Sequence, residues 1–199
     1  MTTDTMLATE TFAERERLAH LLAGLTPEQW SAPSLCTGWR VREVVAHITT
    51  AYRLAPKAFM DGLARENFDF DRFADRQARA DTDALSDADL LASLRENVRH
   101  PWQPPGGGQA GALSHDVIHG LDITEALGLP AVPPERIALV LGNAGEKNLE
   151  YFGVNLDGLR LVATDYEVSL GEGDPVELPV KDVLLTVTGR RPVPTPRGA

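Results

Sequence analysis

The chain has 199 residues, enough for one domain of ordinary size, or for a domain with a small appendage, around a buried core. Nineteen lysines and arginines stand against 29 acidic residues, and the resulting net charge of −10 disfavours binding to a nucleic-acid backbone or to an anionic membrane surface. The polar, acidic start of the sequence and the lack of an apolar run of about 18 residues argue against a signal peptide or a membrane span, so we expect a soluble cytoplasmic protein.

The first half of the sequence predicts helices separated by a structured loop. Apolar residues recur at helical spacing over residues 11–24, where a glycine and then a proline end the pattern. Residues 25–40 contain two prolines and a glycine and are predicted to form an ordered loop. A second helix is expected from Val41 to about Met60, with a kink at Pro56 because proline lacks the backbone donor.

The middle of the sequence predicts two further helices after a poorly defined region. Residues 62–82 are rich in aspartate and arginine and indicate a partly exposed connection with a short helix. Ser86 and Asp89 have the spacing of a capping box at the start of a helix that must stop near Pro101. The segment "LSHDVIHGLDITEALG" then predicts a helix that ends at Gly128.

The C-terminal part changes from helical to alternating periodicity. Residues 134–152 form a fifth amphipathic segment, and "LRLVATDYEVSL" predicts two short strands joined near Asp165. The segment "VKDVLLTVTGRR" fits either a third strand or a short helix. The proline-rich end, residues 192–199, is predicted to be disordered.

Three histidines are candidates for a metal site. His115 and His119 lie four positions apart, so they project along one line of a helix that Asp122 continues, and apolar residues flank this line. His47 lies on another helix whose apolar neighbours direct it toward the core. Three neutral imidazoles form an open site for a divalent ion and leave a coordination position for water or substrate.

The single cysteine, Cys36, excludes an intramolecular disulfide and a cysteine-based zinc site, so any metal must be bound by histidines and carboxylates. Asp122 or Glu43 could hold one imidazole in the required tautomer. The alternative is that the HxxxH pair is solvated, or that the three histidines do not converge and the protein is a helical interaction module.

Two segments resemble a known family. The segment "LTPEQWSAPSLCTGWRVREVVAHI" resembles the N-terminal signature of the mycothiol-dependent maleylpyruvate isomerase-like proteins, within the DinB/YfiT-like superfamily. In that signature, a loop carrying C-x-G-W leads into a helix with a metal-binding histidine. The segment "DVIHGLDITEALGLP" is similar to the family's second metal-binding helix, and "LRLVATD" and "LLTVTGRR" are similar to its C-terminal region. The positions that match the two helix motifs as they stand are Cys36, Gly38, Trp39, His47, His119 and Asp122.

The sequence also departs from the family pattern. The isomerases proper have a glutamate four residues before the helix histidine, whereas this chain has His115, and many DinB-like proteins use such an all-histidine set. The C-terminal part is short for the isomerase's second domain. The resemblance implies a mainly α protein with a DinB-like four-helix bundle over residues 1–153, followed by a small α+β extension over residues 154–191.

The resemblance also implies a function and a cofactor. A divalent metal, zinc or alternatively nickel, would be bound by His47, His115 and His119, with Asp122 behind them, and would hold a mycothiol-like thiol as its thiolate. We therefore expect a metal-dependent enzyme that acts on a small electrophile. It would either transfer the thiol sulfur to this molecule or catalyse its cis–trans isomerisation. Trp39 would line the substrate pocket, and Arg190 of the TGR motif is the candidate catalytic cation.

The other function class is a non-catalytic, metal- or small-molecule-binding DinB-like stress protein. In either case the expected partners are small molecules rather than nucleic acid or membrane, and the chain would be a monomer or a homodimer.

Overall fold

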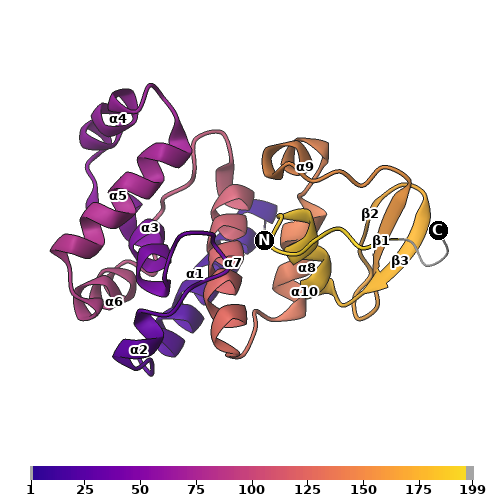
Figure 1. Cartoon of the computed structure of the whole chain (residues 1–199), viewed down its shortest axis with the longest axis horizontal. Helices are drawn as coiled ribbons and strands as arrows, with labels where there is room; N and C mark the ends of the chain where they lie inside the picture. The colour runs from indigo at the N-terminus through magenta and orange to yellow at the C-terminus, as the bar shows by residue number, and fades with distance from the viewer. Residues whose placement is uncertain (1, 196–199) are drawn as a thin grey trace. The chain divides into compact units, whose positions relative to one another are not determined.

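The computed structural model describes residues 2–195 of the chain (Figure 1). Its described part consists mainly of α-helices, with one three-stranded sheet near the C-terminus. This confirms the predicted mainly α class with a small α+β extension. The chain divides into two compact units, the first ending at Pro130 and the second beginning at Ala131. In the described part, no helix is both long and apolar enough to cross a membrane.

The first unit is a helical bundle. Helix α1 packs on α6 and α7, and α3 packs on α5, α6 and α7 (Figure 1). Small residues let the helices approach closely: a Cβ added at Gly120 of α7 would lie 2.8 Å from Oε1 of Glu14 in α1. The helices of this unit are α1 (Thr3–Leu22), α2 (Pro27–Trp30), α3 (Val41–Arg53), α4 (Pro56–Arg65), α5 (Phe70–Ala84), α6 (Asp87–Glu96) and α7 (Gly108–Leu127). Its core includes Leu18, Leu22, Val44, Val45, Ile48, Leu90, Leu94 and Ile123.

Two helix ends follow the predicted capping chemistry. The Ser86 hydroxyl accepts a hydrogen bond from the Asp89 amide, and the Asp89 carboxylate accepts one from the Ser86 amide, which is the predicted capping box. Helix α7 stops at Gly128, whose φ of 63° lies in the left-handed region that glycine adopts without strain. Residues that are close in sequence thus define the start of α6 and the end of α7.

Two predicted boundaries were wrong. Helix α1 begins at Thr3 rather than at residue 11, since the Thr2 hydroxyl caps it by accepting from the Thr5 amide. The second helix is not kinked at Pro56. It ends at Arg53, and Pro56 instead occupies the first turn of α4, where its missing N–H costs no helical hydrogen bond.

The prediction for residues 62–82 was also wrong. They do not form an exposed connection with a short helix, because most of them belong to the end of α4 and to the long helix α5. The polar composition hid a narrow apolar stripe, in which Phe73, Ala74 and Ala78 are buried. Helix α5 packs against α3 along this stripe, so tertiary burial stabilises a segment that is rich in charged residues.

The loop before α3 is ordered, as predicted. The amide of Ser34 donates to the Trp39 carbonyl, and Pro33 and Arg40 form an isolated bridge. Gly38 has a φ of 81°, which closes the turn. The Leu35 amide donates to the backbone carbonyl of Asp122 in α7, so the loop is tied directly to the helix of the histidine pair.

The second unit combines helices with the small sheet. It contains α8 (Pro134–Gly142), α9 (Glu146–Phe152), β1 (Leu159–Ala163), β2 (Ser169–Gly171), β3 (Asp174–Leu178) and α10 (Val180–Val187). Strand β1 lies in the middle, antiparallel to β2 and parallel to β3. The two predicted strands are confirmed, β3 was not foreseen, and the ambiguous "VKDV" segment is a helix. The predicted amphipathic segment over 134–152 is two helices rather than one.

The observed division of the chain differs from the expected domain boundary. We expected the bundle to extend to residue 153, whereas the second unit already begins at Ala131. The reason is that α8 packs against α10, which follows the sheet. Residues 192–195 have no regular secondary structure, and the last four positions of the predicted disordered tail lie outside the described residues.

Candidate metal centre

The three candidate ligands converge in the first unit. His47 comes from the middle of α3, and His115 and His119 come from α7, which packs against α3. One ring nitrogen of each histidine can be chosen so that all three lie within 4.8 Å of one another. The Nε2 atoms of His47 and His115 are 3.2 Å apart. The structure therefore brings together the three side chains that the sequence singled out.

A buried ion pair holds His115. Its Nδ1 lies 2.9 Å from Oδ1 of Asp116, and Oδ2 of Asp116 accepts from Nε of Arg15 at 2.6 Å. The side chains of Arg15 and Asp116 are 1% and 2% exposed, so this pair is shielded from solvent. Arg15 also donates to the backbone carbonyl of His100 at 2.7 Å. The ring of His115 is thus anchored, through Asp116, to α1 and to the segment after α6.

A second carboxylate holds His119. Its Nδ1 lies 2.9 Å from Oδ2 of Asp122, whose side chain is fully buried. Asp122 is therefore placed to act on a histidine as the sequence suggested. The other candidate, Glu43, accepts hydrogen bonds from Arg40 and Thr82 instead.

These contacts determine where the ring protons lie. An ionised carboxylate can only accept, so these contacts place a proton on Nδ1 of His115 and of His119 and leave Nε2 of each ring as the atom that can bind a metal. The pKa of His47 is held well below its ordinary value of 6.5 by burial and then by the neighbouring His119 and His115 rings, so His47 stays neutral. The three imidazoles thus meet at one point, with one ring nitrogen of each directed to the others.

This donor set fits a divalent ion. Nitrogen ligands about 2.1 Å from a tetrahedral zinc would lie about 3.4 Å from one another, close to the 3.2 Å between the His47 and His115 nitrogens. The side chains of His115 and His119 remain 15% and 14% exposed, so the cluster is accessible. The arrangement can hold one ion through three nitrogens and leave a position for an exogenous ligand.

Aromatic rings surround the histidines. The Trp39 ring centroid is 5.1 Å from that of His47, which places Trp39 beside the site as the sequence suggested. Trp102 lies 5.0 Å from His115 and Phe70 lies 6.4 Å from His47, and neither was foreseen. Phe70 comes from the segment that was predicted to be a partly exposed connection with a short helix, and Trp102 follows Pro101, near which the preceding helix was predicted to stop.

Sequence reasoning also missed Asp116 and Arg15. Asp116 directly follows His115 in the sequence. It is therefore not on the helix face shared by His115 and His119, and helical spacing alone did not indicate it. Arg15 is separated from it by about a hundred residues and looked like one charge among many in α1. Only the packing of α1 on α7 brings the two together.

Arg190, the candidate catalytic cation, lies in the second unit just after α10. Its guanidinium is 5.5 Å from the centre of the Phe152 ring and donates to the Thr188 carbonyl at 2.8 Å. Phe152 and Thr188 both belong to the same unit as Arg190. A catalytic role for Arg190 therefore stays a prediction.

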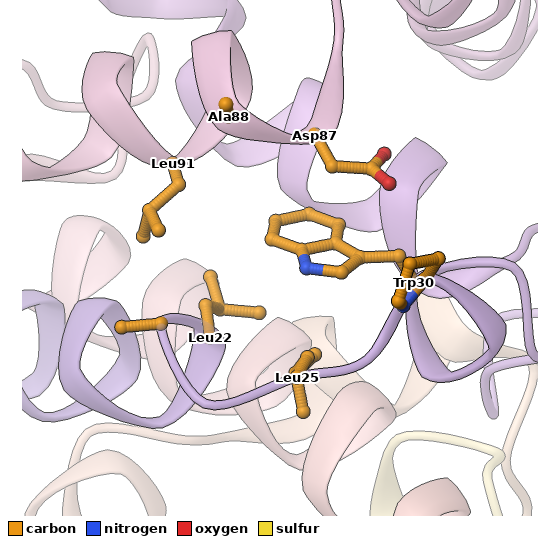
Figure 2. Close-up of a pocket in the computed structure, with 8 residues that line it drawn as sticks. Leu22, Leu25, Trp30, Asp87, Ala88 and Leu91 are labelled. Atoms are coloured by element: carbon orange, nitrogen blue, oxygen red, sulfur yellow. The ribbon is translucent and has the colours of Figure 1, made fainter.

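A separate pocket lies away from the histidines, between the end of α1, α2 and α6. Its volume is about 260 Å³, and Figure 2 shows Trp30 in its wall, facing Leu22, Leu25 and Leu91. Asp87 stands at its edge and pairs with Arg42 at 3.2 Å. The walls are mainly apolar, and the lining residues do not direct several hydrogen-bond donors to one point. This pocket therefore does not indicate a reaction.

The chain is similar to known proteins of one family. Residues 11–101 match the family model described as the mycothiol maleylpyruvate isomerase N-terminal domain. The crystal structure of the mycothiol-dependent maleylpyruvate isomerase has a TM-score of 0.53 and 14% identity, over 96% of this chain and 93% of that chain. A histidine-to-alanine mutant of that enzyme matches with a TM-score of 0.52 and the same identity and coverage.

The two kinds of match have different weight. At 14% identity, the structural likeness shows a shared fold, and it extends over both units of the chain. No curated protein matches the sequence. The family match covers the loop with Trp39 and the helix with His47, which carried the resemblance in the sequence. Residues 11–101 are therefore similar to the N-terminal domain of the mycothiol maleylpyruvate isomerases, and the fold of the whole chain is similar to that of the mycothiol-dependent enzyme.

Proposed function

We propose that this protein is a metal-dependent enzyme that uses a low-molecular-weight thiol, mycothiol or a close analogue, to transfer sulfur to a small electrophile or to isomerise it. The observation that carries the proposal is the convergence of three imidazoles, two of them with their Nδ1 protons fixed by buried carboxylates. The family match supports the thiol, because the related enzyme is named as mycothiol-dependent.

His47, His115 and His119 would hold the ion, with zinc as the first choice and nickel as the alternative. A bound divalent ion would lower the pKa of a thiol that coordinates it, so that the sulfur is ionised and nucleophilic at neutral pH. Asp116 and Asp122 orient two rings by accepting their Nδ1 protons, and burial keeps His47 neutral and able to bind.

The remaining chemistry concerns the electrophile. In an isomerisation, the substrate's double bond accepts the sulfur, rotates as a single bond and is restored when the sulfur leaves, so the thiol is regenerated. Negative charge develops on the substrate when the sulfur adds, and a cation or a hydrogen-bond donor would stabilise it. Arg190 is our candidate for this cation, by its position in the TGR motif.

Metal content and thiol binding test the proposal directly. We expect zinc-reconstituted protein to carry one ion per chain, and His119→Ala to lose it together with thermal stability, since binding free energy adds to folding free energy. His20→Ala is the matched control, because His20 lies exposed on α1. Elemental analysis and melting temperatures with and without chelator provide the readout.

The thiol is tested on the same samples. Mycothiol should raise the melting temperature of zinc-loaded protein, but not that of chelated protein or of His119→Ala. Turnover of maleylpyruvate and of thiol-reactive electrophiles then separates an enzyme from a non-catalytic binding protein. A parent protein that takes up no stoichiometric zinc or nickel and is indifferent to chelator would refute the metal site and the thiol chemistry inferred from it.

A further inference from the structure

Three aromatic side chains, Trp39, Phe70 and Trp102, form what we call the aromatic cluster. Each has its ring centroid within 6.4 Å of a histidine of the candidate metal centre. Phe70 is 42% exposed and the two tryptophans are partly exposed, whereas Trp30 in the separate pocket is only 5% exposed. The cluster therefore offers accessible flat apolar surface directly beside the three imidazoles.

Hydrogen bonds hold the Trp39 ring and the backbone of Trp102 in place. Nε1 of Trp39 donates to Oδ1 of Asp75 at 2.8 Å, and the Arg79 guanidinium binds the same carboxylate. The Trp102 amide donates to Nδ1 of His100 at 3.2 Å. A fixed aromatic surface binds a flat ligand with little loss of conformational entropy.

Phe70 is positioned by an unusual turn. Asn67 and Phe68 have φ angles of 54° and 62°, in the left-handed region that a bulky residue such as phenylalanine rarely adopts. This turn ends α4 and begins α5, and the Phe70 ring then contacts buried Phe73 at a centroid distance of 6.5 Å. Backbone strain of this kind is kept where the surrounding structure specifies it, often at functional sites.

The charges on the helices that carry the histidines and Phe70 do not favour an anionic substrate. Helix α7 contains neither lysine nor arginine. Every arginine of α3 and α5 lies within 3.3 Å of a carboxylate oxygen: Arg42, Arg53, Arg72, Arg76 and Arg79. The helices that carry the histidines and Phe70 thus have their arginines engaged with carboxylates, and a substrate carboxylate would have to compete for them.

We propose that the electrophile used at this site is an uncharged, flat, conjugated or aromatic molecule, whose ring packs on the aromatic cluster with its reactive carbon toward the three histidines. This inference rests on the proposed thiol chemistry and names its substrate class. It contrasts with maleylpyruvate, which carries two carboxylates and would need cationic partners.

A matched pair of electrophiles tests the substrate class. Methyl 4-chloro-3,5-dinitrobenzoate and the corresponding carboxylate have the same ring and leaving group but differ in charge, and the ester is also intrinsically more reactive because it withdraws more electron density from the ring. In the reaction of either, a sulfur–carbon bond forms at the ring carbon, chloride leaves with the electron pair of the broken bond, and the thiol proton passes to buffer. With zinc-loaded protein and mycothiol, we expect kcat/KM, divided for each electrophile by the rate constant of its uncatalysed reaction with mycothiol, to be at least about tenfold higher for the ester.

Variants of the aromatic cluster sharpen the test. Trp102→Leu and Phe70→Leu should raise KM for the ester by about tenfold while leaving zinc affinity unchanged, because the rings bind substrate rather than metal. Phe68→Leu is the matched control: it lies in the same turn and is 66% exposed, and we expect a change of less than about twofold. An equal or higher kcat/KM for the carboxylate, or unaltered KM in both variants, would overturn the inference while leaving the thiol chemistry intact.

A binding measurement separates the two proposals. In a Trp30→Phe background, the remaining tryptophans are Trp39 and Trp102, so their fluorescence reports on the site. Methyl 3,5-dinitrobenzoate, which has no leaving group, should quench this fluorescence at lower concentration than the free acid, and Phe70→Leu should weaken the effect. Quenching of this kind without turnover would support the aromatic site and refute the thiol chemistry. Equal quenching by acid and ester would refute the aromatic site.

Discussion

Two places in the described part of the first unit differ in kind as candidate binding sites. The pocket between α1, α2 and α6 is hollow and apolar, with its one carboxylate engaged with Arg42. The candidate metal centre instead gathers three imidazoles, two buried carboxylates and three aromatic rings. The candidate metal centre offers groups that can bind a ligand through specific bonds, whereas the pocket offers mainly space, so the proposed function is built on the former.

The largest effect is expected at the buried ion pair behind His115. Asp116→Asn leaves the Arg15 guanidinium buried without its charge partner, which should cost about 3–5 kcal/mol of stability in metal-free protein. Zinc affinity should fall by about 10- to 100-fold, because His115 loses the carboxylate that orients it. Urea unfolding and zinc competition titrations measure the two effects.

Two further variants make this prediction decisive. Asp61→Asn removes the carboxylate of the exposed Lys57–Asp61 pair and should change stability by about 1 kcal/mol or less. Arg15→Met with Asp116→Leu replaces the buried pair by apolar residues and should restore most of the stability but not the zinc affinity. If zinc binds the folded double variant as tightly as the parent, Asp116 has no role in positioning His115.

The next effect concerns pH. The pKa of His47 in the folded protein lies below its unfolded value near 6.5, so the unfolded chain binds more protons between the two values. The stability due to neutral His47 is therefore present above about pH 6.5 and is lost as the pH falls toward the folded pKa, by at most about 1.4 kcal/mol per pH unit. Melting temperatures of metal-free protein at pH 7.5 and 5.5 should show this loss.

The pH effect can be assigned by substitution. His47→Gln removes the titrating group and should make the metal-free protein less sensitive to acid than the parent. His20→Gln, on the exposed face of α1, should leave the sensitivity unchanged. Equal acid sensitivity of all three proteins would show that carboxylates elsewhere, and not His47, cause the loss.

The smallest effect is expected in the apolar pocket. Leu91 lies in the pocket wall and is only partly buried, so Leu91→Ala should cost about 1 kcal/mol. Leu94 of the same helix is fully buried, and Leu94→Ala should cost about 3 kcal/mol because it creates a cavity. Neither change should alter zinc affinity, and a marked loss of zinc binding in Leu91→Ala would show that the two regions are coupled.

The sequence by itself determined features that depend on local geometry. The spacing of His115 and His119 follows from the period of one helix, and the cap at Ser86 and the stop at Gly128 depend on backbone groups a few residues away. The ordered loop before α3 was likewise indicated by its prolines and glycine. In each case the interacting groups are close in sequence, so a short pattern contains the physical cause.

Tertiary structure decided what depends on distant partners. Helix α5 is stabilised by burial against α3, which its polar composition concealed, and the chain divides after Pro130 because α8 packs on α10. Asp116 follows His115 directly in the sequence, but its burial in an ion pair with Arg15 depends on the packing of α1 on α7. Phe70 and Trp102 join the candidate metal centre only through the turns that place them beside His47 and His115. A buried charge or an aromatic ring acquires its role from the groups that surround it in space, and those groups are far away in the sequence.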